Sequence, residues 1–356
     1  MEPLVLDISR AIDAILSGDD LTFRQSYEVM SHLMSEDNNP VLTASLLTAL
    51  RNSREKAEEI AGFSAAMLDH AEFIEYTRDE PLIDIVGTGG AQFKTFNVST
   101  TASLVLPSIG VSVAKHGNRS NSSPSGSADL LEALGVNITM NPERAMEALN
   151  KNGLTFMFAP LYHPAMKHIV PVRKTLRFRT IFNLLGPLTN PARVKRQLTG
   201  LFSLEYLLPV AQALQQRGHE RAILVHSDLG ADEVTNVGTT HVAELNEGHI
   251  TEYTLTAKSF GLTPCNPMEI SSISPEESAR EVVRILSGSK SPRADFTKVN
   301  ASLALRASGR EESLPELVTV VEEVLESGSA IDNIRNLIRV SGGDEDSLED
   351  IINVVG

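Results

Sequence analysis

The spacing of apolar residues changes once along the chain, near Pro81, and this change limits the possible folds more than any other feature. Before it, apolar residues recur three and four positions apart, as at Ile8, Ile12 and Ile15, which is the spacing of a buried helix face. Residues 1–73 contain no alternating stretch typical of a strand. We therefore predict that this N-terminal segment is all-helical.

Residues that favour helix starts divide this segment further. Thr22, followed three positions later by Gln25, is a capping box, in which two side chains satisfy free N–H groups at the start of a helix. The same reasoning applied to Asn52 and Glu55 predicts a helix that begins there and runs to about His70.

Beyond Pro81, short apolar runs alternate with helical patterns. The expected strands cover residues 82–86, 111–114, 155–158 and 222–225, followed by a hairpin of 241–245 and 250–253. Such alternation favours a mainly parallel sheet covered by helices. We therefore predict an α/β chain with a small helical domain (1–75), a larger α/β domain (76–340) and an acidic extension (341–356). The run 342–346 is expected to be a flexible joint before a short helix.

The charge balance argues against one class of partner. The chain has 31 Lys and Arg against 46 Asp and Glu, a net charge of −15, and so acidic a surface repels a nucleic-acid backbone. No run approaches the ~20 apolar residues of a membrane span. Cys265 is the only cysteine, so neither an internal disulfide nor a cysteine-metal cluster is expected. The acidic N-terminus lacks the basic start of a signal peptide, and we expect a cytoplasmic location.

A glycine turn follows the first expected strand. Gly87, Gly89 and Gly90 let the backbone turn tightly and approach a ligand closely. Asn97 and Ser99 then open a helix, whose free N–H groups and positive dipole end favour a phosphate. Taken alone, the glycine motif is more typical of a turn and helix cap that bind no ligand.

A second polar segment follows the next strand, where open α/β sheets place ligands. The run KHGNR (115–119) contains two fixed cations, and a serine-rich loop with Pro124 and Gly126 comes after it. This loop offers many hydrogen-bond donors with little bulk, which suits a pyrophosphate or a sugar phosphate. A solvated serine-rich loop is the alternative.

Taken together, these segments resemble the signature segments of anthranilate phosphoribosyltransferases over about residues 5 to 340. The matching segments are GTGG (87–90), TFNVST (95–100), VAKHGNR (113–119), SGSADLLEALG (125–135), HPAMK (163–167), VRKTL (172–176), RTIFNLLGPLTNPA (179–192) and GADEV (230–234). The resemblance implies transfer of ribose 5-phosphate from phosphoribosyl pyrophosphate (PRPP) to anthranilate in tryptophan synthesis, in a cleft between the two domains. It also implies that a segment near 163–185 returns to the helical domain, and that the protein is a homodimer.

The resemblance carries site residues over to matching positions. Those implied to bind PRPP are Gly87, Gly90, Ala91, Thr95, Asn97, Val98, Ser99, Thr100, Lys115, His116, Gly117, Asn118, Arg119, Ser120, Asn121, Ser122, Ser123 and Ser127. Those implied to contact anthranilate or line its entrance are Gly87, Asn118, His116, Tyr162, His163 and Arg173. Magnesium, expected as two ions, would be held by Ser99, Asp232 and Glu233. No residue is assigned as a catalytic acid or base.

The types of some of these residues suit the implied roles. Arginine binds a carboxylate bidentately, as Arg173 would, although most arginines simply lie at the surface. Magnesium prefers one or two carboxylates together with substrate phosphates, as Asp232 and Glu233 would supply, although an Asp-Glu pair in a loop is by itself typical of a solvated surface.

The chain departs from the family pattern directly after GTGG, where Ala91-Gln92 replaces the usual Asp-Gly. Because that Asp normally helps to seat the pyrophosphate and its magnesium, we predict that the ammonium of Lys94 partly replaces it.

Two other functions stay open on the sequence. A pyrimidine nucleoside phosphorylase shares the fold, but the phosphate loop resembling KHSTGGVGD is absent. An inactive relative that binds nucleic acid would need a basic cleft, which the net charge of −15 disfavours.

Overall fold

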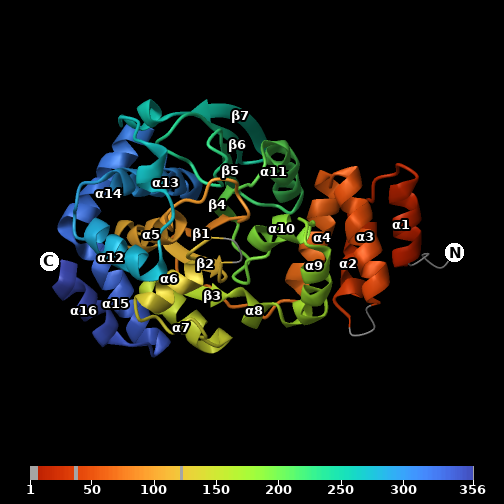
Figure 1. The fold of residues 1–356 in the computed structure, drawn as a ribbon, viewed down its shortest axis with the longest axis horizontal. Coiled ribbons are helices and arrows are strands. Elements are labelled where there is room, and N and C mark those ends of the chain that lie inside the picture. Colours follow the sequence, from red (N-terminus) through yellow and green to blue (C-terminus); the bar gives the residue numbers. More distant parts are fainter. Residues whose placement is uncertain (1–6, 36–38, 121–122, 356) are drawn as a thin grey trace.

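The computed structural model describes residues 7–35, 39–120 and 123–355. Four helices form a bundle at one end of the molecule, and the C-terminal helices lie at the other end (Figure 1). The bundle consists of α1 (Ile8–Leu16), α2 (Phe23–Leu33), α3 (Pro40–Ser53) and α4 (Ala57–Asp69). The predicted capping box of Thr22 and Gln25 is present at the start of α2. Among the described residues before Pro81, every regular element is a helix, as the apolar spacing predicted.

A seven-stranded sheet with the order β3-β2-β1-β4-β5-β6-β7 forms the centre of the larger part. Its strands are β1 (Leu82–Gly87), β2 (Ser112–Gly117), β3 (Leu154–Phe158), β4 (Arg196–Gly200), β5 (Arg221–Ser227), β6 (Thr240–Asn246) and β7 (His249–Leu255). The first five strands in the order run parallel, whereas β6 pairs antiparallel with both β5 and β7. The predicted mainly parallel sheet and its hairpin are therefore confirmed.

Helices cover both faces of this sheet. The helices that follow the bundle along the chain are α5 (Val98–Val105), α6 (Ser127–Ala133), α7 (Pro142–Asn152), α8 (Ala159–Tyr162), α9 (Val170–Leu176), α10 (Phe182–Leu185), α11 (Leu207–Gln216), α12 (Pro275–Leu286), α13 (Pro292–Ser308), α14 (Leu314–Ser327), α15 (Ser329–Ser341) and α16 (Glu345–Val355), and all but α9 and α10 belong to the α/β part. Side chains alternate along β5, so that Ile223 and Val225 enter the core that contains α5 and α13, while Ala222 and Leu224 enter the core that contains α11. No described helix is long and apolar enough to cross a membrane.

The core of the N-terminal bundle includes a segment from much later in the chain. Ile169, Val172 and Phe182 belong to the same buried cluster as Leu46 and Phe63. The helices α9 and α10 accordingly lie beside the bundle in Figure 1. This segment carries Arg173, so the bundle determines where that side chain lies. The domain boundaries themselves stay a prediction.

The predicted helix start at Asn52 is wrong. Helix α3 continues through Asn52, because its buried face extends to the last turn, and Arg54 ends it with a φ of 63°. The next helix follows Lys56. Glu55 does not cap a helix: its carboxylate is buried and accepts a hydrogen bond of 2.6 Å from the Tyr206 hydroxyl, which lies in the α/β part.

The run 342–346, expected to be a flexible joint, is instead a hydrogen-bonded turn at 342–344 followed by the first two residues of α16. Gly342 ends α15 with a φ of 71°, and the Asp344 N–H donates a 2.8 Å hydrogen bond to the Gly135 carbonyl. Helix α16 then packs on the α/β part through Leu348, which is fully buried.

Two glycines at the carboxyl ends of β1 and β4 allow the loop after β5 to cross directly over them. Gly87 and Gly200 are partners in the register of these strands. A Cβ on Gly200 would lie 1.4 Å from the carbonyl oxygen of Asp232, and one on Gly87 would lie 2.7 Å from its carboxylate. The chain leaves β1 towards β2 and returns from β3 to β4, so this is the topological switch point at which open α/β sheets bind ligands.

We expect Gly200→Ala to lower the free energy of unfolding by about 2–3 kcal/mol, because a methyl group there overlaps the Asp232 backbone in the loop after β5. Gly186→Ala is the matched control, since its φ is −49° and a Cβ there would meet no atom within 4 Å. Chemical denaturation measures both variants. Equal stability of Gly200→Ala and the control would contradict the close approach of the loop.

Candidate active site

Two acidic side chains lie next to the glycine turn at the switch point. A carboxylate oxygen of Asp232 accepts a 2.7 Å hydrogen bond from the Gly89 N–H, and a carboxylate oxygen of Glu233 accepts one of 2.8 Å from the Thr95 hydroxyl. Burial raises the pKa of both carboxyl groups, and the charge of Asp232 raises that of Glu233 further. The positive charges of Lys94 and Lys115 act in the opposite direction on Glu233. The structure thus brings together acids and cations that are far apart in the sequence.

Lys115 is a buried cation whose charge acts on Glu233. It lies on β2, and its Nζ donates a 2.7 Å hydrogen bond to the Ile85 carbonyl on β1. Burial lowers the pKa of Lys115 to about 8, while the charges of Asp84 and Glu233 oppose that shift. A cation held in this way has a fixed position and little hydration to lose when an anion binds.

Asp84, which the sequence analysis missed, is part of the network that positions this lysine. It is fully buried on β1 and accepts hydrogen bonds from the Asn190 side chain (2.7 Å) and the His116 N–H (3.4 Å). Burial raises the pKa of Asp84 to about 6, and the charge of Lys115 opposes this. A carboxylate in the middle of the apolar run 82–86 was a signal for such a network, because a buried charge needs a partner.

Asn97 connects the two segments that were expected to bind phosphate. Its amide nitrogen donates to the Ser125 carbonyl (3.2 Å), and its amide oxygen accepts from the Ser278 hydroxyl (2.9 Å). It immediately precedes α5, in whose first turn Val98 and Thr100 are buried and Ser99 is partly exposed.

The serine-rich loop is closed by the start of α6. Asp129 accepts hydrogen bonds from the backbone N–H groups of Ser120 (3.1 Å) and Gly126 (2.8 Å). The Ser120 and Ser123 hydroxyls lie 2.6 Å apart. Asn121 and Ser122 lie outside the described residues.

The residues at the start of the serine-rich loop are also closely packed. The Ser127 hydroxyl donates to the Asn118 carbonyl (3.2 Å), and a Cβ on Gly117 would lie 2.3 Å from that hydroxyl. Arg119 forms ion pairs with Asp129 (3.0 Å) and Glu132 (2.8 Å), so its charge is already balanced on α6.

His116 and His163 form a buried, uncharged pair. Their ring centroids lie 5.1 Å apart, and burial lowers their pKa values to about 3 and about 4. Among the described residues, Nε2 of His116 and both ring nitrogens of His163 have no hydrogen-bond partner. Tyr162 is fully buried in the α/β core, and its hydroxyl donates to the Met140 carbonyl (3.1 Å).

Two arginines extend from the segment that packs on the bundle. Arg173, on α9, lies over the Phe182 ring at 5.4 Å, and burial lowers its pKa. No carboxylate pairs with Arg173 in the part of the chain that the structure describes. Arg179, which the sequence analysis did not single out, donates to the Gly90 carbonyl and lies 4.6 Å from the centre of the Phe202 ring. Its position in the family-like segment 179–192 was the available signal.

Position 91 differs from the surrounding loop in its burial. The Ala91 side chain is only 4% exposed, whereas Gln92 is exposed. The Phe93 N–H donates to the Gly230 carbonyl (3.1 Å), which fixes the loop against the one that carries the acidic pair. Lys94 is partly exposed and lies close enough to that pair to affect the pKa of both acids.

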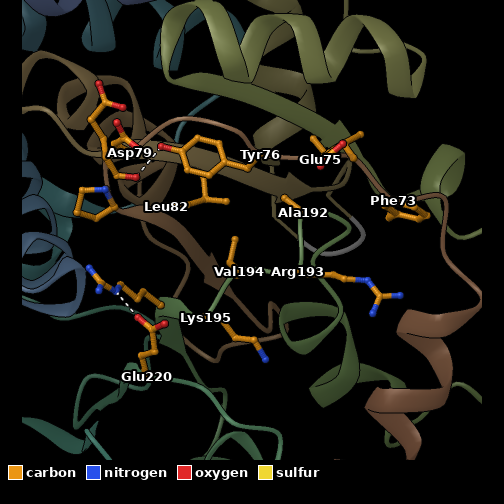
Figure 2. Close-up of a pocket in the computed structure, with 14 residues that line it drawn as sticks. Phe73, Glu75, Tyr76, Asp79, Leu82, Ala192, Arg193, Val194, Lys195 and Glu220 are labelled. Carbon is orange, nitrogen blue, oxygen red and sulfur yellow. Dashed lines mark hydrogen bonds and ion pairs between the residues drawn. The ribbon is translucent and has the colours of Figure 1, made fainter.

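A pocket of about 710 Å³ lies at the opposite edge of the sheet, by the amino-terminal ends of β1 and β4. Figure 2 shows Tyr76, Leu82 and Lys195 around it. None of the residues that the sequence singled out for binding lines this pocket, so it is separate from the candidate active site.

Comparisons with known proteins assign the whole arrangement to a family. The helical bundle domain of a glycosyl transferase family matches residues 9–71, and the a/b domain of a glycosyl transferase family matches residues 79–331. An anthranilate phosphoribosyltransferase of Lacticaseibacillus casei is 40% identical over 345 residues, which are 97% of this chain and 99% of the relative. One of Desulfotalea psychrophila is 42% identical over 336 residues, 94% of this chain and 97% of the relative.

Solved structures agree with these relatives. Anthranilate phosphoribosyltransferase from Thermus thermophilus has a TM-score of 0.88 and 43% identity, covering 93% of this chain and 99% of that one. The enzyme from Saccharomyces cerevisiae, solved in complex with PRPP and Mg, has a TM-score of 0.84 and 29% identity, covering 94% and 98%. The chain therefore belongs to the family of anthranilate phosphoribosyltransferases.

Proposed function

We propose that this chain transfers the 5-phosphoribosyl group of PRPP to the amine of anthranilate, releases pyrophosphate, and requires magnesium. The observation that carries the proposal is the contact of Asp232 with the glycine turn, which sets an acidic pair beside the turn that follows β1. Two relatives that this chain matches over 97% or more of their length are named anthranilate phosphoribosyltransferase, the enzyme of this reaction. The homodimer, the two magnesium ions and the cytoplasmic location stay predictions.

Asp232 and Glu233 suit magnesium when the substrate supplies the remaining oxygens. No group of three or more His, Cys, Asp or Glu side chains is arranged to hold a metal within the described ranges. Two carboxylates that are destabilised by burial and by each other are stabilised by a bound cation, and magnesium is commonly held by one or two carboxylates and by phosphates. Ser99, at the start of α5, is the third proposed ligand.

The residues around the pyrophosphate would act on the charge that develops during the reaction. Breaking the C1–O bond of the ribose places negative charge on the leaving pyrophosphate, which Lys115 and the loop N–H groups would stabilise from fixed positions. Bound magnesium would add positive charge at the same oxygens. Asn97 would keep the glycine turn and the serine-rich loop in register around the substrate.

Anthranilate would be held by its carboxylate. Arg173 is a partly buried guanidinium whose charge no described carboxylate balances, which suits bidentate binding of this group. The unsatisfied ring nitrogens of His116 and His163 would face the substrate or water as neutral groups. Because the aromatic amine is already uncharged at pH 7, positioning should contribute more than a general base.

The first test follows anthranilate fluorescence with PRPP and magnesium. We expect magnesium-dependent loss of emission, and a decrease in turnover of roughly 100-fold or more in the Asp232→Ala/Glu233→Ala variant, as for the loss of a fixed stabiliser of transition-state charge. Asp228→Ala, which removes an exposed carboxylate nearby, should keep wild-type turnover. Phosphate-dependent release of a free base, or a salt-sensitive shift of DNA in a gel, without anthranilate turnover would favour the alternative functions.

Arg173→Ala should raise the KM for anthranilate by about 10–150-fold, which corresponds to one charge-assisted hydrogen bond of roughly 1.5–3 kcal/mol, with little change in the KM for PRPP. Lys174→Ala removes a charge from the next, exposed position of α9 and should have no effect. If Arg173→Ala raises both KM values equally, Arg173 serves the fold or the other substrate.

Lys94→Ala should raise the KM for PRPP by about 10-fold, because an ammonium near the acidic pair would contact the pyrophosphate as a point charge. Adding Ala91→Asp should restore part of that affinity for PRPP at high magnesium. Because the two positions share one loop, the effects of the two substitutions on the free energy of PRPP binding should not be additive. Steady-state kinetics at low and high magnesium decide the matter. If Lys94→Ala has the wild-type kcat and KM for PRPP at both magnesium concentrations, Lys94 does not replace the Asp that the family usually has at position 91.

A further inference from the structure

We propose that a second anion-binding site lies at the back of the interface between the helical bundle and the α/β part, and that it takes a small phosphate or carboxylate. The site is a pocket of about 350 Å³. Its lining comes from both parts of the molecule: Ala65, Leu68 and Asp69 belong to α4 or its end, while Gln197 belongs to β4 and Gln216 to α11.

The charges around this pocket are mostly positive in a chain whose net charge is −15. Three cations line it, namely Arg193, Lys195 and Arg217, against the single carboxylate of Asp69. The Asp69 carboxylate has two partners: it accepts a hydrogen bond from the Tyr27 hydroxyl (3.0 Å) and forms an ion pair with Arg193 (3.2 Å). Lys195 and Arg217 form no ion pair with a carboxylate among the described residues, and only the more distant charges of Glu220 and Asp69 act on them.

Arg217 is held so that part of its guanidinium stays available. Its Nη1 donates to the Leu188 carbonyl (2.6 Å) and the Ser64 hydroxyl (3.1 Å), which fixes the plane of the group. Its Nε and Nη2 have no hydrogen-bond partner in the parts of the chain that the structure describes. Burial lowers the pKa of Arg217 to about 10, so the group is a desolvated cation that a bound anion would stabilise.

His219 provides an independent sign of a missing ligand. It is only 8% exposed and lines the same pocket, yet its Nδ1 has no hydrogen-bond partner among the described residues. Burial and the charges of Arg217 and Lys195 lower the pKa of His219 to about 3, against the opposing effect of the Leu214 backbone, so the ring is neutral and can donate one N–H. Buried polar atoms without a partner are rare, and a bound polar group is one way to satisfy them.

Lys195 is the third cation that lines the pocket. Its Nζ donates to the Arg217 carbonyl (3.2 Å), and Figure 2 shows Lys195 and Arg193 extending away from Tyr76 and Asp79. The pocket lies by the amino-terminal ends of β4 and β5, whereas the candidate active site lies at the carboxyl ends of β1 and β4. The two sites are therefore on opposite edges of the sheet.

The test is calorimetric titration of the full chain with inorganic phosphate and, separately, with malonate, at an ionic strength held constant with chloride. Lys115→Met is included because it removes a cation of the candidate active site, where phosphate would also bind. We expect one binding event to survive in Lys115→Met. That event should weaken at least about 10-fold in Arg217→Met and in Lys195→Met, the scale of one charge-assisted hydrogen bond.

Lys290→Met is the matched control, since this lysine is highly exposed and far from the pocket lining. Lys195→Met keeps the test decisive if Arg217→Met fails to fold. Stronger binding of phosphate or of malonate identifies which anion the pocket takes. The absence of any event that survives Lys115→Met, or equal weakening in Lys290→Met, would overturn the proposal, and neither outcome depends on the transfer reaction.

Discussion

The hydrogen bond from the Gly89 N–H to the Asp232 carboxylate joins residues 143 positions apart, and the arrangement of the site depends on it. It forms only because Gly87 and Gly200 have no side chains to hold the loop away from the strand ends. The same close approach sets Glu233 beside Thr95 and within range of Lys115. Backbone geometry at two glycines thus determines the charge distribution of the site.

Burial is the second constraint, because a charged side chain that is removed from water is destabilised unless an opposite charge or a hydrogen bond compensates it. Lys115 and Asp84 are both buried on adjacent strands, and Asn190 fixes the carboxylate from a third segment. On the bundle side, the segment that carries Arg173 is anchored by apolar packing of Ile169 and Phe182. Substrate binding between groups fixed in this way costs little reorganisation, which is the usual basis of electrostatic catalysis.

Much of this could be predicted from the sequence, and the failures have physical causes. Glycine turns and apolar alternation located β1, β2 and the hairpin, since these signals are local. Strand β4 was missed because Leu198 is its only large apolar residue, while Gln197 and Thr199 are buried polar groups. The capping box at Asn52 failed because Glu55 bonds Tyr206, 151 residues away. Contacts of that range, such as the one between Arg179 and Gly90, leave no local pattern.

The proposed function depends most on a metal ion that the acidic pair would hold against the glycine turn. The most direct test is a crystal structure of this chain with PRPP and manganese in place of magnesium, in which anomalous scattering locates the metal. We expect anomalous density within bonding distance of Asp232 or Glu233, with the pyrophosphate beside Gly87 to Gly90. Metal bound to the pyrophosphate alone, with both carboxylates out of contact, would contradict it.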